Sequence, residues 1–170
     1  MKYAKLMKND TVDTDSGICV SIWMQGCPFR CKGCHNPDTW DYNGGIDIDE
    51  SILIEMVIDA INENGINRNL SILGGEPLCP KNVHFVKKLI DIVKQKYPNI
   101  KIFCWTGYSY EDLWIQPMAS LFYILQTVDV LITGPYIEEQ RDITLKLRGS
   151  RNQEIWRRKN DKLVLDTSEI

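Results

Sequence analysis

Apolar, β-rich runs alternate with amphipathic runs along this chain of 170 residues, and that alternation limits its fold more than any other feature. Short buried strands are predicted at 18–24, 69–73, 100–105 and 128–132. Helices are predicted at about 47–64, 80–97 and 110–126, with Pro117 as a candidate break in the last. Strands that alternate with helices form right-handed parallel βαβ units. We therefore expect an α/β fold, an open partial (β/α) barrel of parallel strands.

The loops that follow the four predicted strands carry the unusual residues of the chain. They hold a cysteine-rich segment, Gly74-Gly75-Glu76-Pro77, Thr106-Gly107-Tyr108 and Thr133-Gly134-Pro135, in that order. In parallel α/β architectures the working surface lies at the carboxyl ends of the strands. All four loops should therefore meet on one rim, where we expect the functional site.

Three cysteines stand within eight residues at Cys27, Cys31 and Cys34, with the spacing C-x3-C-x2-C. This spacing supplies three thiolates to one centre. A four-iron cluster normally takes four cysteines, so a cluster held by three leaves one iron with an open position. A small molecule can bind and react at an open metal position. The spacing therefore favours a [4Fe–4S] cluster over a closed structural site.

Zinc is the alternative, because the three cysteines and His35 could form a Cys3His site. Structural zinc sites usually draw their ligands from two short pairs separated by a longer spacer, and no second C-x2-C pair is present. Cys19 and Cys104 fall in apolar runs and are predicted to be small buried side chains. Cys79 could be a fourth ligand, but we favour a structural role.

Gly74 and Gly75 allow the backbone to approach a ligand closely after the second strand. The segment is not a phosphate loop, because it fits neither of the common glycine-rich phosphate motifs. An ordinary tight connection to the next helix is the simpler interpretation. Beside an open iron, however, a glycine-lined edge suits the amino-acid portion of a ligand. Glu76 could orient its amine or cap the following helix.

Composition places the chain among ordinary globular proteins, with 44% apolar residues, 25% charged residues and a net charge of −3. The net charge gives no electrostatic case for nucleic-acid binding. No apolar run approaches the roughly 20 residues needed to cross a bilayer. We also expect no secretory signal and no disulfide framework. The expected location is cytoplasmic, without a nucleic-acid or membrane partner.

Several segments together resemble the radical S-adenosylmethionine superfamily, and more closely the activating enzymes of anaerobic (class III) ribonucleotide reductase. The matching segments are GCPFRCKGCHNPDTW at 26–40, LSILGGEPLCPKNV at 70–83, WTGYSYEDL at 105–113, DVLITGPYIEEQRD at 129–142 and LRGSRNQ at 147–153. The cysteine motif is typical of the superfamily, while WTGY, RGSxNQ and the short length point to the activases. The resemblance covers most of the chain.

The resemblance implies a set of site residues but no catalytic residue beyond the cluster and the cofactor. The three motif cysteines would hold the cluster, and the amino and carboxylate groups of S-adenosylmethionine would bind its fourth iron. By similarity, Gly33, Cys34 and His35 would lie along the cofactor. Gly74, with Gly75 and Glu76 beside it, would meet its methionine end. Many superfamily members carry an aromatic residue at the position of Gly33, so His35 is a candidate to cover the adenine.

The implied reaction is the reductive cleavage of S-adenosylmethionine to methionine and a 5′-deoxyadenosyl radical. That radical would take hydrogen from a glycine of the reductase, the protein substrate, and leave a glycyl radical there. A low-potential electron donor such as a flavodoxin or a ferredoxin would supply the electron. The alternatives are an activase of another glycyl radical enzyme of the pyruvate formate-lyase type, a radical enzyme with a small-molecule substrate, and a structural zinc-binding module.

The end of the chain is basic although the whole chain is net acidic. We divide the chain into a radical S-adenosylmethionine partial-barrel domain at 1–140 and a basic C-terminal extension of the same domain at 141–170. One interpretation of the extension is a solvated, partly disordered end. The other is a surface, with Arg157 and Arg158, that steers an acidic partner or reductant.

Overall fold

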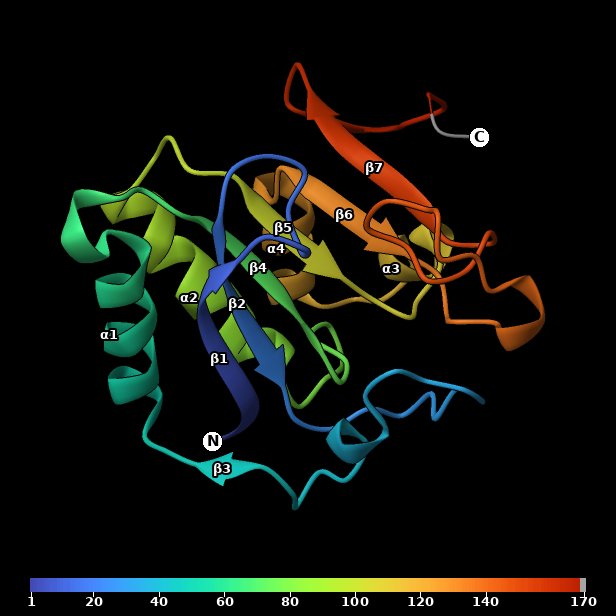
Figure 1. Cartoon of the computed structure of the whole chain (residues 1–170), viewed down its shortest axis with the longest axis horizontal. Helices are drawn as coiled ribbons and strands as arrows, with labels where there is room; N and C mark the ends of the chain where they lie inside the picture. The colour runs from blue at the N-terminus through green and yellow to red at the C-terminus, as the bar shows by residue number, and fades with distance from the viewer. Residues whose placement is uncertain (169–170) are drawn as a thin grey trace.

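A single mixed sheet organises the computed structural model, which describes residues 1–168 (Figure 1). Its eight strands run in the order β3-β1-β2-β4-β5-β6-β7-β8. The four central strands are parallel and match the four predicted strands. They are β2 (Cys19–Met24), β4 (Asn69–Gly74), β5 (Ile102–Trp105) and β6 (Val130–Thr133). The predicted open partial barrel with a parallel core is confirmed.

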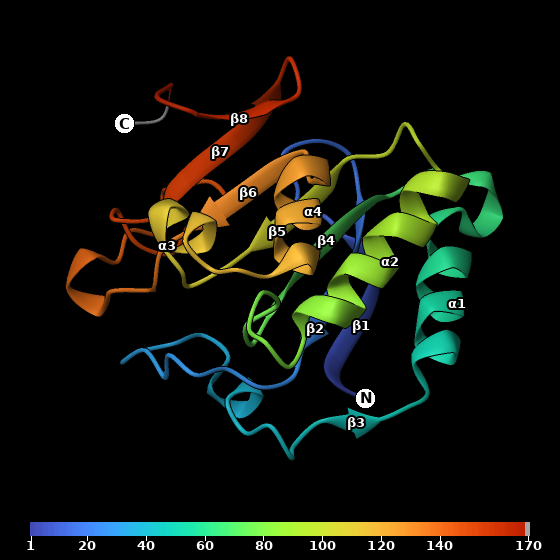
Figure 2. The same cartoon turned by 180° about the vertical axis from the view of Figure 1, so that it is seen from behind.

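Three helices cover one face of this sheet, as Figure 2 shows. They are α1 (Glu50–Ile61), α2 (Val83–Lys96) and α4 (Ala119–Thr127). Their apolar sides form the main core with the sheet. A smaller cluster around Phe103 and Ile132 is also buried, so the central strands read as nearly continuous apolar runs. The short helix α3 (Tyr110–Trp114) is separated from α4 by Pro117, as the sequence predicted.

Short 3-10 turns connect several of these elements. They are η1 (Pro37–Thr39), η2 (Glu63–Gly65) and η3 (Glu138–Gln140). Helix α1 ends at Ile61, before the predicted end at about residue 64, and η2 follows it.

Four antiparallel strands extend the sheet at its two edges. They are β1 (Lys2–Asp10), β3 (Ile46–Asp47), β7 (Glu154–Lys159) and β8 (Lys162–Leu165). Strands β1 and β3 lie on one side, and the β7–β8 hairpin pairs with β6 on the other. The prediction of a disordered end is therefore wrong for the hairpin, which belongs to the sheet.

The two arginines proposed for steering have partners inside the protein. Arg157 donates hydrogen bonds to Asp15 at 2.5 Å and to Asp166 at 2.6 Å. Arg158 donates to the carbonyl oxygens of Leu125 at 2.7 Å and Val128 at 2.8 Å, at the end of α4. These contacts hold the hairpin against the domain, so Arg157 and Arg158 do not form a free basic surface.

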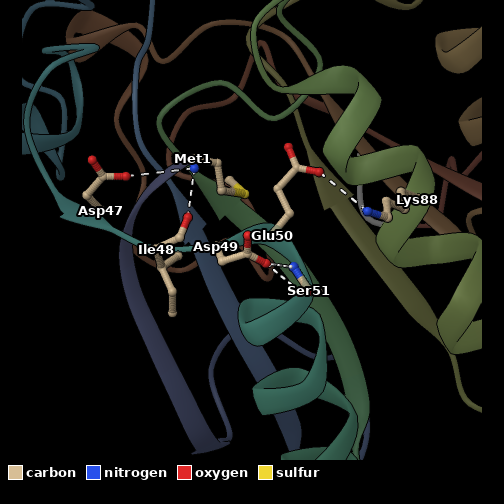
Figure 3. Close-up of a pocket in the computed structure, with 7 residues that line it drawn as sticks. All are labelled: Met1, Asp47, Ile48, Asp49, Glu50, Ser51 and Lys88. Carbon is tan, nitrogen blue, oxygen red and sulfur yellow. Dashed lines mark hydrogen bonds and ion pairs between the residues drawn. The ribbon is translucent and has the colours of Figure 1, made fainter.

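The start of α1 lies beside the amino terminus, in a shallow depression shown in Figure 3. Asp49 caps the helix by accepting a hydrogen bond from the Ser51 N–H at 2.8 Å. The terminal amine of Met1 donates to the carbonyl oxygen of Ile48 at 2.7 Å. This depression contains none of the predicted site residues, and its contacts fix β1 to the helix.

Within residues 1–168, no helix is both long enough and apolar enough to cross a membrane.

Candidate active site

A cavity of about 350 Å³ opens at the carboxyl ends of the four parallel strands. Each of the four predicted loops contributes to its wall: the cysteine loop, 73–76, 105–107 and 134–136. The segment 145–149 and the β1–β2 loop complete the lining. The alternation of strands and helices predicted that the unusual residues meet on one rim. The structure confirms this prediction.

All three motif cysteines line this cavity, and each is a free thiol. Burial raises the pKa of Cys27 to about 11, although the backbone N–H groups of Phe29 and Arg30 donate to its sulfur. Burial also raises the pKa of Cys31, whose sulfur accepts from the Tyr136 N–H. Cys27 and Cys31 are thus held in a partly dry environment, and metal binding there would release their protons.

The chemistry of this donor set fits an iron–sulfur cluster better than a single zinc ion. Among residues 1–168, no three His, Cys, Asp or Glu side chains are close enough together to hold one metal ion. A structural zinc ion needs four such ligands around one centre. In a four-iron cluster each thiolate binds a different iron, so the sulfurs stand farther apart. Trp40 also lines the cavity, and its buried Nε1–H has no hydrogen-bond partner in the protein. This N–H group could donate to a group bound in the cavity.

Gly74 and Gly75 line the cavity, as predicted, and also cross very close to the cysteine loop. A Cβ on Gly75 would stand 2.5 Å from the carbonyl oxygen of Gly26. The Gly75 N–H donates to Met24 and the Glu76 N–H to Gly26, both at 2.8 Å. The glycines therefore allow two rim loops to pack backbone to backbone.

Glu76 lines the cavity but does not cap a helix, since α2 begins at Val83. Its buried carboxylate accepts hydrogen bonds from the Leu78 N–H at 2.8 Å, the Thr106 hydroxyl at 2.8 Å and the Gly107 N–H at 2.7 Å. Burial raises its pKa to about 7 despite these donors. Glu76 thus joins the loops after β4 and β5, a role that the sequence did not indicate.

Gly33 is not part of the cavity wall, although it was predicted to lie along a cofactor. A Cβ there would overlap the carboxylate of Glu138, so the loop after β6 explains why this position is glycine. His35 does line the cavity, and its ring centroid lies 5.0 Å from that of Tyr136. His35 remains the predicted cover for an adenine, now with Tyr136 beside it.

Several lining residues were missed by the sequence reasoning. Asp13, from the β1–β2 loop, lines the cavity, and burial together with a hydrogen bond to Asp10 raises its pKa to about 7. Tyr136 was missed because its contacts are with the cysteine loop, far away in the sequence. Cys79 is buried and does not line the cavity, which agrees with the structural role favoured for it.

Known proteins are similar to this chain over nearly its whole length. Residues 15–156 match a family described as a 4Fe-4S single cluster domain. An anaerobic ribonucleoside-triphosphate reductase-activating protein of Haemophilus influenzae is 36% identical over 158 residues, which are 92% of this chain and 98% of the relative. A protein of the same name from Vibrio cholerae is 35% identical, with the same two coverages. One from Enterobacteria phage T4 is 34% identical over 92% of this chain and 94% of its own length.

The matched family spans the parallel core, the cysteine loop and the cavity, and the relatives are matched almost from end to end. The chain therefore belongs to the 4Fe-4S single cluster domain family and, within the radical S-adenosylmethionine enzymes, to the activating proteins of anaerobic ribonucleoside-triphosphate reductase.

Proposed function

We propose that this chain activates an anaerobic ribonucleoside-triphosphate reductase by installing a glycyl radical on it, with Cys27, Cys31 and Cys34 as the cluster ligands. The observation that carries the proposal is the presence of three free thiols in the wall of one cavity at the carboxyl ends of the parallel strands. When bound there, the cluster and S-adenosylmethionine would supply one-electron cleavage of a sulfonium and the abstraction of hydrogen.

The protein's own residues would place and protect these groups. Backbone N–H groups donate to the sulfurs of all three cysteines, including one from Asn36 to Cys34 at 3.4 Å. Such donors orient the thiolate ligands and change the reduction potential of the metal centre. Gly74 and Gly75 present open backbone at the cavity wall, which suits the amino-acid end of the cofactor. His35 and Tyr136 offer aromatic surface for its adenine.

Glu76 supports the site chiefly through the loops that it joins. Both of its carboxylate oxygens already accept from the protein. We propose that it fixes the third loop against the second, so that the cofactor's methionine end meets a rigid edge. Any direct contact with the amine would be additional to these three hydrogen bonds.

The test is an anaerobic mixture of the reconstituted chain, reductant, S-adenosylmethionine and the reductase, read by electron paramagnetic resonance. A glycine-centred doublet on the reductase is expected, and Cys31→Ala should abolish it, while Cys79→Ala, at a buried position outside the cavity, should keep it. A doublet that formed only on an enzyme of the pyruvate formate-lyase type would show that this enzyme, and not the reductase, is the protein substrate. A colourless protein that bound zinc would contradict the proposal.

The electron would come from a low-potential donor such as a flavodoxin or a ferredoxin, since the reaction needs reducing power. We also propose a cytoplasmic location, because the six cysteines are free thiols and an exposed cluster needs reducing surroundings.

A further inference from the structure

We propose that Glu138 lowers the reduction potential of the centre held by the cysteine loop, and that Tyr136 holds Glu138 in place. Glu138 begins η3, the turn that follows β6 and the cavity-lining segment 134–136. The inference rests on the proposed function, since it requires a cluster on the three cysteines. A low reduction potential would suit that cluster to the reductive cleavage of S-adenosylmethionine.

The carboxylate of Glu138 lies directly against the cysteine loop. A Cβ added to Gly33 would overlap Oε2 of Glu138 and would stand 2.7 Å from its Cδ. Gly33 is the residue immediately before Cys34 and the second residue after Cys31. The negative charge of Glu138 is therefore placed against the short segment that joins Cys31 to Cys34.

Tyr136 binds the carboxylate and the loop at the same time. Its hydroxyl donates to Oε2 of Glu138 at 2.5 Å, and this hydrogen bond raises the pKa of Tyr136. Its backbone N–H donates to the sulfur of Cys31, and its ring packs beside His35. A Cβ on Gly149 would also stand 3.1 Å from the Tyr136 ring, so the ring packs against the backbone at Gly149. Tyr136 thus fixes where the charge of Glu138 stands.

A fixed negative charge opposes the addition of an electron nearby and so lowers the reduction potential. The N–H donors at the sulfurs act in the opposite direction. Because reductive cleavage of a sulfonium needs a strongly reducing centre, a carboxylate at this position serves the proposed reaction. Glu138 is half-buried, so its charge is less screened by solvent and salt than that of a fully exposed group.

The neighbouring Glu139 provides a matched control. Its side chain is 70% exposed, and it pairs with Lys32 at 3.5 Å. Glu139→Gln removes one negative charge from the same turn, as Glu138→Gln does. Glu139, however, is more exposed and has the cation of Lys32 beside it. A specific effect of Glu138 should therefore exceed that of Glu139, and the difference should persist at high salt.

The experiment compares the reconstituted full chain with Glu138→Gln, Glu139→Gln and Tyr136→Phe. Iron and sulfide content are measured first, and then the reduction midpoint by potentiometric titration followed by electron paramagnetic resonance. Glu138→Gln should keep the wild-type iron content and move the midpoint to a more positive potential. Glu139→Gln should give a smaller shift. Tyr136→Phe keeps the carboxylate charge but removes the hydroxyl that holds it in place, so its midpoint should shift in the same direction as that of Glu138→Gln, by a smaller amount.

A midpoint for Glu138→Gln equal to that of the wild type, or to that of Glu139→Gln, would overturn the inference. Loss of iron from Glu138→Gln would also overturn it, because Glu138 would then serve only to shape the loop. If the wild-type chain itself formed no cluster, the proposed function would fail together with the inference, and iron analysis separates that case from the others.

Discussion

At the scale of single residues, Glu76 is a buried carboxyl group whose protonation should affect stability. Burial raises its pKa from the ordinary 4.5 to about 7 in the folded protein, so the folded state binds this proton more tightly than the unfolded state. The stabilisation is complete below pH 4.5 and is lost as the pH rises through about 7. The free energy of unfolding should therefore fall between pH 5 and pH 8, by roughly 2–3 kcal/mol from this group.

Urea denaturation of the wild type and Glu76→Gln at pH 5 and pH 8 measures this contribution. At pH 5 the carboxyl group is protonated and neutral, as the amide is, so the variant should be close to the wild type in stability there. Its stability should also change less with pH than that of the wild type. Asp13, whose pKa is also raised to about 7, acts in the same direction in both proteins and so cancels in the comparison. Equal pH dependence in the two proteins would contradict the assignment.

Gly75 tests whether the rim loops depend on close backbone contact. A Cβ there would meet the carbonyl oxygen of Gly26 at 2.5 Å and that of Met24 at 3.0 Å, and neither backbone atom can move freely. Gly75→Ala should cost about 1–3 kcal/mol and displace Cys27, the residue after Gly26, so bound iron should fall. Thermal unfolding and iron analysis measure the two effects.

Gly65→Ala is the control, since its φ of +71° is unfavourable for alanine but no atom lies within 4 Å of the added Cβ. It should lose about 1–2 kcal/mol of stability while keeping its iron. If Gly75→Ala also kept its iron, the contact would not position the cluster ligand.

Sequence spacing was enough to predict that the three cysteines share one place, since all of them lie in one loop and line one cavity. It could not identify Glu138 or Tyr136, because they meet the cysteine loop only when β6 is placed beside β5 in the sheet. It also could not explain Gly33, whose neighbour is more than a hundred positions away.

At the scale of elements, the four central strands could be predicted because both of their faces are buried and their sequences are almost entirely apolar. The edge strands gave no such signal. Strand β1 reads KYAKLMKND and β7 reads EIWRRK, so charged residues interrupt any alternation. Edge strands commonly carry charges, and these ones are defined by pairing with distant partners.

The β7–β8 hairpin should depend on Arg157, which joins the β1–β2 loop to the segment after β8. Its side chain is 25% exposed and donates to both Asp15 and Asp166. Arg157→Gln should reduce the free energy of unfolding by about 1–2 kcal/mol, because it removes the cation from Asp166 and leaves Asp15 with Lys101 alone. Chemical denaturation of this variant and of Lys159→Gln, an exposed position on the same strand, measures the difference.

The acid side of the stability profile tests the same contact. Hydrogen bonds from Ser168 and Arg157 hold the pKa of Asp166 well below its ordinary 3.8, so its contribution is present above pH 3.8 and is lost as the pH falls further. Arg157→Gln should therefore weaken this loss on acidification. If the stability of Arg157→Gln and of Lys159→Gln fell identically with decreasing pH, Arg157 would not tether the hairpin.

At the scale of the whole molecule, the sheet ends in β3 on one side and β8 on the other, so the barrel stays open. The helices cover only one face of the sheet (Figures 1 and 2). The rim loops meet at the cavity that the three cysteines line. An incompletely walled site suits a substrate that is itself a protein and supplies the missing wall. We therefore expect that the isolated chain, without a protein partner, does not convert a small molecule in a fixed ratio to the S-adenosylmethionine that it consumes.

The most direct measurement of the central claim is the electron paramagnetic resonance spectrum of the reduced, anaerobically reconstituted chain, recorded with and without S-adenosylmethionine. We predict one [4Fe–4S] cluster per chain, lost in Cys27→Ala, Cys31→Ala and Cys34→Ala, and a spectrum that changes when S-adenosylmethionine binds the open iron. A fully ligated cluster with a spectrum unaltered by S-adenosylmethionine, or a zinc-bound protein without a spectrum, would contradict it.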